Sequence, residues 1–392
     1  MSQTFVVHPD CWEHPHGDER WQALDFKPDG LGVHAPFGPL LLQQVVEDAS
    51  AGVWSSDVLV TVPCGTRGFP AVVGGGLAAT AEQALTLGWI EAFERRCSFR
   101  RPREQLVFAV QPPGLAMSEA VAEEAPMWWT QAHGLDGEPT WLPLKEAVLA
   151  SQWRGTPPVA TDTTGMSAHT SKERAILHGL REWLERSVLH RWWTQPDSTR
   201  CSIHSRIASD LMRGTSLALP DSACEVWHLR HGDWHVAGCV IFTERRIRPT
   251  AAFGGGTALT ADAAVNAAWR EAFQMHIAPQ PVVTREGQVV FGPPIGHTPV
   301  DEDFRIRFLA QFPARSDCTE PGREEPIDHG EEAGTRDSIL KVIDGPVATV
   351  DCGDELTDAL GLHVLRVLCP ALPRFTPDTR TPSGLAPAFL GG

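Results

Sequence analysis

One pattern occurs three times in this 392-residue chain and constrains the fold more than any other feature. In each copy, glycines precede a helical segment that carries a glutamate and, three residues later, a second glutamate or a glutamine. The first glutamates of the three copies are Glu91, Glu182 and Glu271, which are 91 and 89 residues apart. That period is too long for a solenoid repeat, so we expect three non-adjacent helices that converge on one site.

The start of each repeated helix is indicated by capping residues. Thr80 with Gln83, and Thr170 with Glu173, fit the capping box, in which side chains satisfy backbone amides at the helix start. Thr260 fits an N-cap without a complete box. The three helices are expected to end near Cys97, Trp193 and His276, and the second to be the longest in the chain.

The cap also predicts where the glutamates lie relative to the glycines. Glu91 follows Thr80 by eleven residues. This separation is about 16 Å along a helix that rises about 1.5 Å per residue. We therefore expect the glycine turns and the helix N-termini to lie away from the carboxylates.

The rest of the chain alternates strand and helix patterns, which predicts an α+β fold. Short apolar runs bounded by turn formers predict strands at 39–46, 58–63, 106–111, 139–144, 157–160, 225–229, 234–242, 348–350 and 364–368, and a helix is expected within 117–133. Residues 1–38 read as an irregular N-terminal segment, 39–380 as one domain with a loop-rich insertion at 280–340, and 381–392 as an extended Pro/Gly tail.

Composition excludes several classes of function. The formal charge of −16 repels phosphate backbones, so nucleic-acid binding is disfavoured. Nine cysteines without paired spacing, and an N-terminus without a signal-peptide pattern, are typical of a cytoplasmic protein with reduced thiols. No apolar run reaches the roughly 18 residues that a membrane span needs.

Two groups of histidines are candidate ligand sites. The N-terminal group is interpreted as surface residues because prolines interrupt it and no second ligand pair stands at a finger-like distance; it comprises His8, Cys11, His14 and His16. The other group flanks the hairpin predicted around residues 231–233, where a shared site is possible but not required by the strand alternation; it comprises His228, His231 and His235.

The repeated helices point to a metal-bound nucleotide. Residues three and four apart share a helix face, which groups Glu91, Glu94 and Arg95 on one helix and Glu182, Glu185 and Arg186 on another. Five acids that meet at the edge of a core, the fifth being Glu271, repel one another unless divalent cations bind between them. Magnesium favours carboxylate oxygens together with substrate phosphates, and the arginines would offset phosphate charge.

Two other sites fit the sequence less well. A phosphate-binding loop is disfavoured because no Gly-x-x-x-x-Gly-Lys-Ser/Thr occurs. A dinuclear iron site is disfavoured because it needs Glu-x-x-His, whereas the third residues here are Glu94, Glu185 and Gln274.

At these residues the chain resembles the YcaO family, whose members share two Glu-x-x-Glu-Arg motifs and a third Glu-x-x-Gln. The segments 91–96 and 184–193 look most like the heterocyclase subunits of microcin B17-type synthetases. The resemblance implies mixed or antiparallel sheets packed with helices around a central ATP site, with ATP and Mg²⁺ as cofactors. By motif, the metal ligands would be Glu91, Glu94, Glu182, Glu185 and Glu271, the phosphate contacts Arg95 and Arg186, and the nucleotide contact Gln274.

The activity that the resemblance implies is ATP-dependent conversion of Cys, Ser or Thr in a ribosomal precursor peptide to azolines. The implied partners are that peptide, a separate leader-recognising protein and a flavin dehydrogenase of the same complex. Two alternatives stay open: a thioamide-forming enzyme that uses sulfide, and a catalytically degenerate scaffold. The chain departs from the family pattern at Gly75, Leu87, Thr164 and His276 and in its tail, which lacks Pro-x-Pro-x-Pro.

Overall fold

The computed structural model describes residues 3–4, 40–48, 52–61, 71–98, 105–112, 114, 116–117, 126–147, 163–195, 210–211, 221–243, 249–283, 289–294, 298–312, 332–343, 345–373 and 375. The predicted strand at 157–160, the N-terminal histidine group and the C-terminal tail all lie outside these residues.

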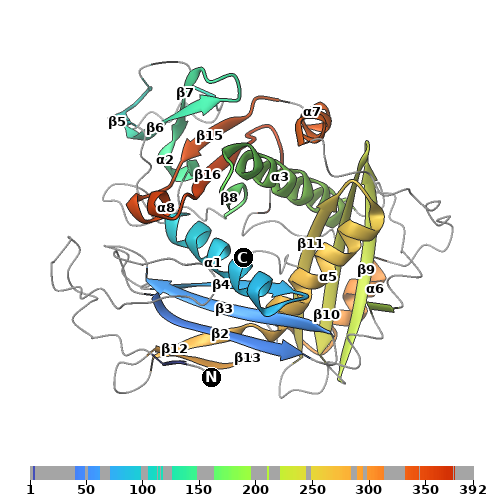
Figure 1. Cartoon of the computed structure of the whole chain (residues 1–392). Helices are drawn as coiled ribbons and strands as arrows, with labels where there is room; N and C mark the ends of the chain where they lie inside the picture. The colour runs from blue at the N-terminus through green and yellow to red at the C-terminus, as the bar shows by residue number, and fades with distance from the viewer. Residues whose placement is uncertain are drawn as a thin grey trace.

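Antiparallel sheets make up most of the described fold (Figure 1). The first, in the order β1-β2-β3-β4, comprises Gln3–Thr4, Leu40–Asp48, Val53–Thr61 and Ala71–Ala78. The second, in the order β14-β11-β10-β9, comprises Thr298–Pro299, Thr250–Ala258, Trp234–Thr243 and Ser222–His231.

A third sheet joins distant parts of the chain. It has the order β5-β6-β15-β16-β8, with β7 paired to β6, and comprises Leu106–Ala109, Met127–Gly134, Ala348–Asp351, His363–Leu368, Met166–His169 and Pro139–Pro143. A separate hairpin pairs β12 (Pro279–Val283) with β13 (Val289–Pro294).

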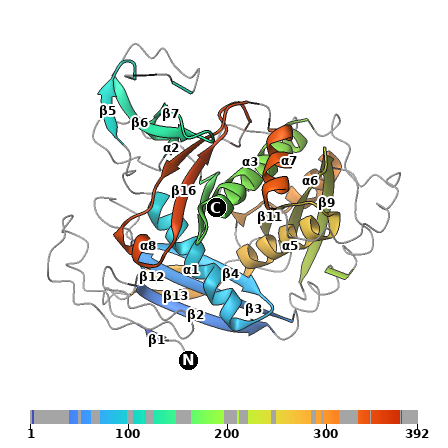
Figure 2. The same ribbon diagram turned by 45° about the horizontal axis from the view of Figure 1, so that its top comes forward.

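The three repeated helices are α1 (Ala81–Ser98), α3 (Lys172–Thr194) and α5 (Ala261–Ile277). Helix α1 packs on β3 and β4, α5 packs on β10 and β11, and α3 lies against β8, β16 and β11 (Figure 2). The shorter helices are α2 (Leu144–Ala147), α6 (Phe304–Gln311), α7 (Glu332–Val342) and α8 (Glu355–Ala359). This mixture of helices and antiparallel sheets confirms the predicted α+β class.

Glycines let two of these helices lie directly on their strands. A Cβ on Gly74 of β4 would collide with backbone atoms of Ala92, and a Cβ on Gly254 of β11 would collide with backbone atoms of Ala268 and Ala272. Each helix therefore contacts its preceding strand through backbone rather than side chains, so the separation is smaller than any other residue would permit.

The largest cluster of buried hydrophobic residues surrounds α3. Its aromatic side chains Trp183, Trp192 and Trp193 are buried, and Trp183 donates from its indole Nε1 to the Val367 carbonyl at 2.7 Å. Phe308 of α6 packs against Trp192 and Trp193. The large buried surface holds α3 in place between the second and third sheets.

Helix α1 is tied to the third sheet by a buried ion pair. Arg96 contacts Asp354, which is the N-cap of α8, and the two side chains are only 8% and 2% exposed. The other Asp354 oxygen accepts from the Thr357 amide at 2.8 Å. Helix α8 lies beside α1 in both views, and its Leu356 joins the cluster around Phe93 (Figure 1, Figure 2).

One local prediction was only partly covered by the structure and another was wrong. Of the range 117–133, residues 127–133 belong to strand β6 (Met127–Gly134), which pairs with β5 and β7, whereas residues 118–125 are outside the described part. The second repeated helix is capped by Ser171 rather than Thr170, since the Ser171 hydroxyl accepts from the Arg174 amide at 3.3 Å.

Most other predicted elements match the structure, including the β9–β10 hairpin and the N-cap at Thr260. The range 280–340 holds the short elements β12–β14, α6 and part of α7 between segments outside the described part. None of the helices among the described residues has the length and apolar composition of a bilayer crossing.

Candidate functional site

The first glutamate of each repeat is held by a backbone amide of a glycine in the same repeat. Glu91 accepts from the Gly75 amide at 2.6 Å, Glu182 from the Gly165 amide at 2.9 Å, and Glu271 from the Gly255 amide at 2.5 Å. The donor and acceptor residues are 16, 17 and 16 positions apart. The three repeats thus build the same local unit.

This geometry corrects the expectation that the glycines lie away from the carboxylates. The strand that precedes each helix runs back alongside it, and the five residues from Gly75 to Thr80 span about 16 Å at about 3.3 Å per residue. Because strand and helix run in opposite directions over the same length, Gly75 lies level with Glu91. Only the helix N-termini are remote, and Gly75 and Gly255 lie within strands rather than turns.

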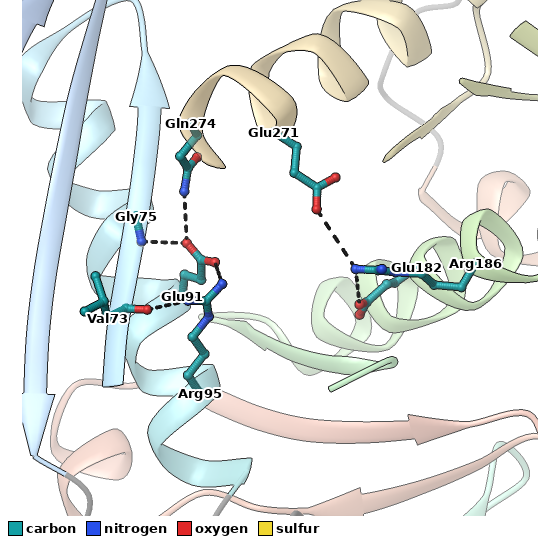
Figure 3. Close-up of polar contacts among 8 residues, drawn as sticks. All are labelled: Val73, Gly75, Glu91, Arg95, Glu182, Arg186, Glu271 and Gln274. Atoms are coloured by element: carbon teal, nitrogen blue, oxygen red, sulfur yellow. Dashed lines mark hydrogen bonds and ion pairs between the residues drawn. The ribbon is translucent and has the colours of Figure 1, made fainter. Parts of the chain in front are cut away.

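The residue three positions later reaches the next repeat. Glu94 of the first repeat accepts from the Ala168 amide of the second at 2.6 Å. Glu185 of the second lies where a Cβ on Gly255 of the third would be. Gln274 of the third lies against Gly75 of the first and donates to Glu91 at 3.2 Å (Figure 3). We call this closed set of six side chains the carboxylate ring: Glu91, Glu94, Glu182, Glu185, Glu271 and Gln274.

Two arginines contact carboxylates of the ring (Figure 3). Arg95 pairs with Glu91 at 2.7 Å and donates to the Val73 carbonyl at 2.6 Å. Arg186 lies between two repeats, 3.8 Å from Glu182 and 4.0 Å from Glu271. Each arginine therefore offsets carboxylate charge at a different part of the ring.

Burial and mutual repulsion raise the pKa of three ring carboxyls. Burial is the largest cause for Glu94, Glu185 and Glu271. The charges of Glu91 and Glu182 raise the pKa of Glu94 further, and the charge of Glu271 does so for Glu185. Arg186 acts in the opposite direction on Glu185 and Glu271, and Arg95 does so on Glu94. The ring therefore favours bound protons or bound cations.

The donor chemistry fits magnesium. All five acids present oxygen ligands, and each first glutamate uses one oxygen on its glycine amide while Glu91 and Glu182 turn the other toward an arginine. In the described residues, no three acidic, histidine or cysteine side chains already stand close enough to enclose an ion. Magnesium does not require such a cage, because it keeps waters and binds through one or two carboxylates plus substrate phosphates.

A family model described as YcaO cyclodehydratase, ATP- and Mg²⁺-binding, matches residues 75–373. The chain belongs to the YcaO family. Its cofactors are therefore ATP and Mg²⁺, and we identify it as an ATP-dependent enzyme of the YcaO kind. No curated protein matches the sequence.

Solved structures share the fold at low sequence identity. YcaO from Methanopyrus kandleri, bound with AMPPCP and Mg²⁺, has a TM-score of 0.62 and 19% identity over 85% of this chain and 86% of its own. A heterocyclase in complex with substrate and cofactor has a TM-score of 0.61 and 16% identity over 85% of this chain and 50% of its own. The Escherichia coli microcin synthetase McbBCD complex has a TM-score of 0.58 and 15% identity over 86% of this chain and 89% of the matched chain.

The structure thus brings together the eight residues that the three repeated motifs predicted, and it adds backbone donors. The amides of Gly75, Gly165, Gly255 and Ala168 were not anticipated. The nearly constant spacing from glycine to glutamate in the three copies was the signal that could have revealed the first three.

The positions that depart from the family pattern lie in different surroundings. Gly75 leaves the space that Gln274 occupies. Leu87 is 46% exposed, whereas Thr164 and His276 are buried. His276 lies 3.4 Å from the Thr243 hydroxyl.

The hairpin histidines form a pair rather than a three-ligand site. His228 and His235 are buried, and their ring nitrogens are 2.7 Å apart. His231 ends β9 at the hairpin. The pair is not part of the carboxylate ring.

Proposed function

We propose that this YcaO protein is a cyclodehydratase that converts Cys, Ser or Thr residues of a ribosomally made precursor peptide to azolines. The observation that carries the proposal is the carboxylate ring, in which three repeats bring five acids, one amide and two arginines together. Figure 3 shows three of these acids, the amide and both arginines. Such a ring suits a nucleotide whose phosphates are held by cations rather than by a glycine loop.

The roles of the ring residues follow from their chemistry. Glu91, Glu94, Glu182, Glu185 and Glu271 would hold Mg²⁺, which neutralises charge on the triphosphate when bound. Cations on Glu91 and Glu182 would release Arg95 and Arg186 from those carboxylates to contact phosphate oxygens. The amide of Gln274 would donate to the nucleotide.

The proposed reaction balances with ATP as the only co-reactant. The side-chain thiol or hydroxyl of the precursor adds to the preceding amide carbonyl, and the resulting oxyanion accepts the γ-phosphoryl group of ATP. Phosphate then leaves with the amide oxygen as the ring C=N bond forms, which yields ADP, phosphate and the azoline. Such phosphoryl transfer depends chiefly on positioning and charge neutralisation.

The reaction as proposed involves two further proteins. A separate partner would recognise the leader of the precursor, and a flavin dehydrogenase of the same complex would oxidise azolines to azoles. The likeness to a chain of the McbBCD synthetase complex supports an assembly of this kind.

The test is reconstitution with partner, precursor, ATP and magnesium, read by mass spectrometry. Loss of one water per modified residue, with one ADP formed, supports the proposal. An ¹⁸O label in the target amide carbonyl should appear in the released phosphate.

Exchange of oxygen for sulfur in the presence of sulfide would instead support thioamide formation. Unchanged precursor without precursor-dependent ADP release would favour a scaffold. Omission of ATP is the matched control for the reconstitution.

A further inference from the structure

An arginine beside the carboxylate ring has no counter-charge within the part of the chain that the structure describes. Arg181 lies on α3 directly before Glu182 and one turn before Glu185, and it is partly buried. Among the described residues its guanidinium makes no hydrogen bond or ion pair, and its Nε is fully buried without a partner. Its specific contact is with the ring of Trp234, 5.6 Å from the guanidinium carbon.

The neighbouring arginines differ in this respect. Arg95 pairs with Glu91, Arg96 with Asp354, and Arg186 with Glu182 and Glu271. Burial lowers the pKa of Arg181, and among the described residues no carboxylate opposes that effect. Charged side chains are seldom buried unless an opposite charge accompanies them, so the site is suited to an anion from outside the chain.

Trp234 fixes how that anion would be met. The indole is fully buried, so it presents a rigid face to the guanidinium. A guanidinium held over an aromatic ring keeps its N–H groups in the guanidinium plane, where they match the oxygens of a phosphate or carboxylate.

The surrounding charge also favours an anion. Arg174, His178 and Arg181 follow one another at helical spacing on α3, and the charges of Arg181 and Arg174 contribute, after burial, to lowering the pKa of His178 to about 4. His178 is therefore neutral at pH 7, and the two arginines carry the positive charge of this helix face in a chain with a formal charge of −16. Arg181 is the closer of the two arginines to Glu185 along α3.

We propose that Arg181 binds a phosphate oxygen of the nucleotide, one helical turn outside the carboxylate ring. Residues four apart on a helix are about 6 Å apart, so the side chain lies within reach of a triphosphate held on Glu185 and Glu271. The inference rests on the proposed function. Arg95 and Arg186 would have to leave their glutamate partners to contact phosphate, whereas Arg181 would not.

The test compares Arg181→Met with Arg270→Met by calorimetry of AMPPCP binding to the full chain in magnesium. Methionine keeps an unbranched apolar side chain over Trp234 but removes the charge. Arg270 is the matched control, because it directly precedes Glu271 as Arg181 precedes Glu182, yet it is exposed.

The Kd of AMPPCP should rise about 10- to 100-fold in Arg181→Met, the range for loss of a hydrogen bond to a charged group, and stay near wild type in Arg270→Met. The same loss should appear with tripolyphosphate and be absent with adenosine. Binding of Mn²⁺ alone should not change, because Arg181 is no metal ligand.

Wild-type AMPPCP affinity in Arg181→Met would overturn the inference and leave the proposed function standing. An equal loss for adenosine would also overturn it, since Arg181 would then bind the base. Absence of AMPPCP binding by wild-type protein would refute the nucleotide site itself and this contact with it.

Discussion

Replacing Asp354 by Asn should destabilise the protein strongly, because it leaves the Arg96 guanidinium buried without its partner. The side chains of Arg96 and Asp354 are 8% and 2% exposed, so solvent screens the pair very little. Removing one member of such a pair costs about 3–5 kcal/mol. Asparagine can still accept from the Thr357 amide, so the α8 cap, worth about 1 kcal/mol, should remain.

The measurement is the free energy of unfolding from urea denaturation, with Arg96→Met combined with Asp354→Asn as the companion variant. The double variant removes both buried charges and should recover most of the lost stability. A single variant that loses less than about 1 kcal/mol, or a double variant that loses as much as the single, would contradict the assignment of a desolvated ion pair.

Three further predictions concern the repeats. Gly255→Ala should displace Glu185 from the carboxylate ring and raise the Kd of AMPPCP in magnesium by roughly tenfold; unchanged affinity would show that the close approach is dispensable. Without metal, the folded state binds protons at Glu94, Glu185 and Glu271 more tightly than the unfolded state does, because the pKa of each carboxyl is raised above its ordinary value of 4.5. The free energy of unfolding should therefore fall as pH rises above 4.5. In thermal melts over a pH series, added magnesium should reduce that fall. Ser171→Ala should cost about 1 kcal/mol in urea denaturation and Thr170→Ala much less; the reverse order would restore the cap predicted from sequence.

The sequence was most informative where residue spacing alone decides structure. Helical spacing and capping residues located α1, α3 and α5 to within a residue or two, and the shared pattern indicated that their glutamates meet. Strand alternation located the β9–β10 hairpin in the same way. These features depend on residues that are close together in the sequence, so the sequence alone reveals them.

The glycine-rich strands were missed for a physical reason. Gly74–Gly76 and Gly254–Gly256 have low strand propensity and read as turns, yet β4 and β11 use glycine so that a helix can lie on the strand backbone. The need for glycine arises from a helix that packs across the strand. Propensity does not report that contact.

Contacts between repeats were beyond sequence reasoning as well. That Glu94 reaches the Ala168 amide depends on β16 pairing with β8, which joins residues nearly 200 positions apart. The Arg96–Asp354 pair spans 258 positions and carries no local signature. Strand β6 was not predicted either, because its pairing with β5, β7 and β15 joins segments that lie apart in the sequence.

Glu182→Gln tests most directly whether the carboxylate ring holds the metal-bound nucleotide. Glutamine can keep the hydrogen bond from the Gly165 amide while it removes one ring charge. Glu82→Gln, on the exposed start of α1, is the matched control. We predict that magnesium-dependent AMPPCP affinity, measured by calorimetry, falls at least about tenfold in Glu182→Gln and stays at the wild-type value in Glu82→Gln. Equal affinity in Glu182→Gln and wild type would contradict the account.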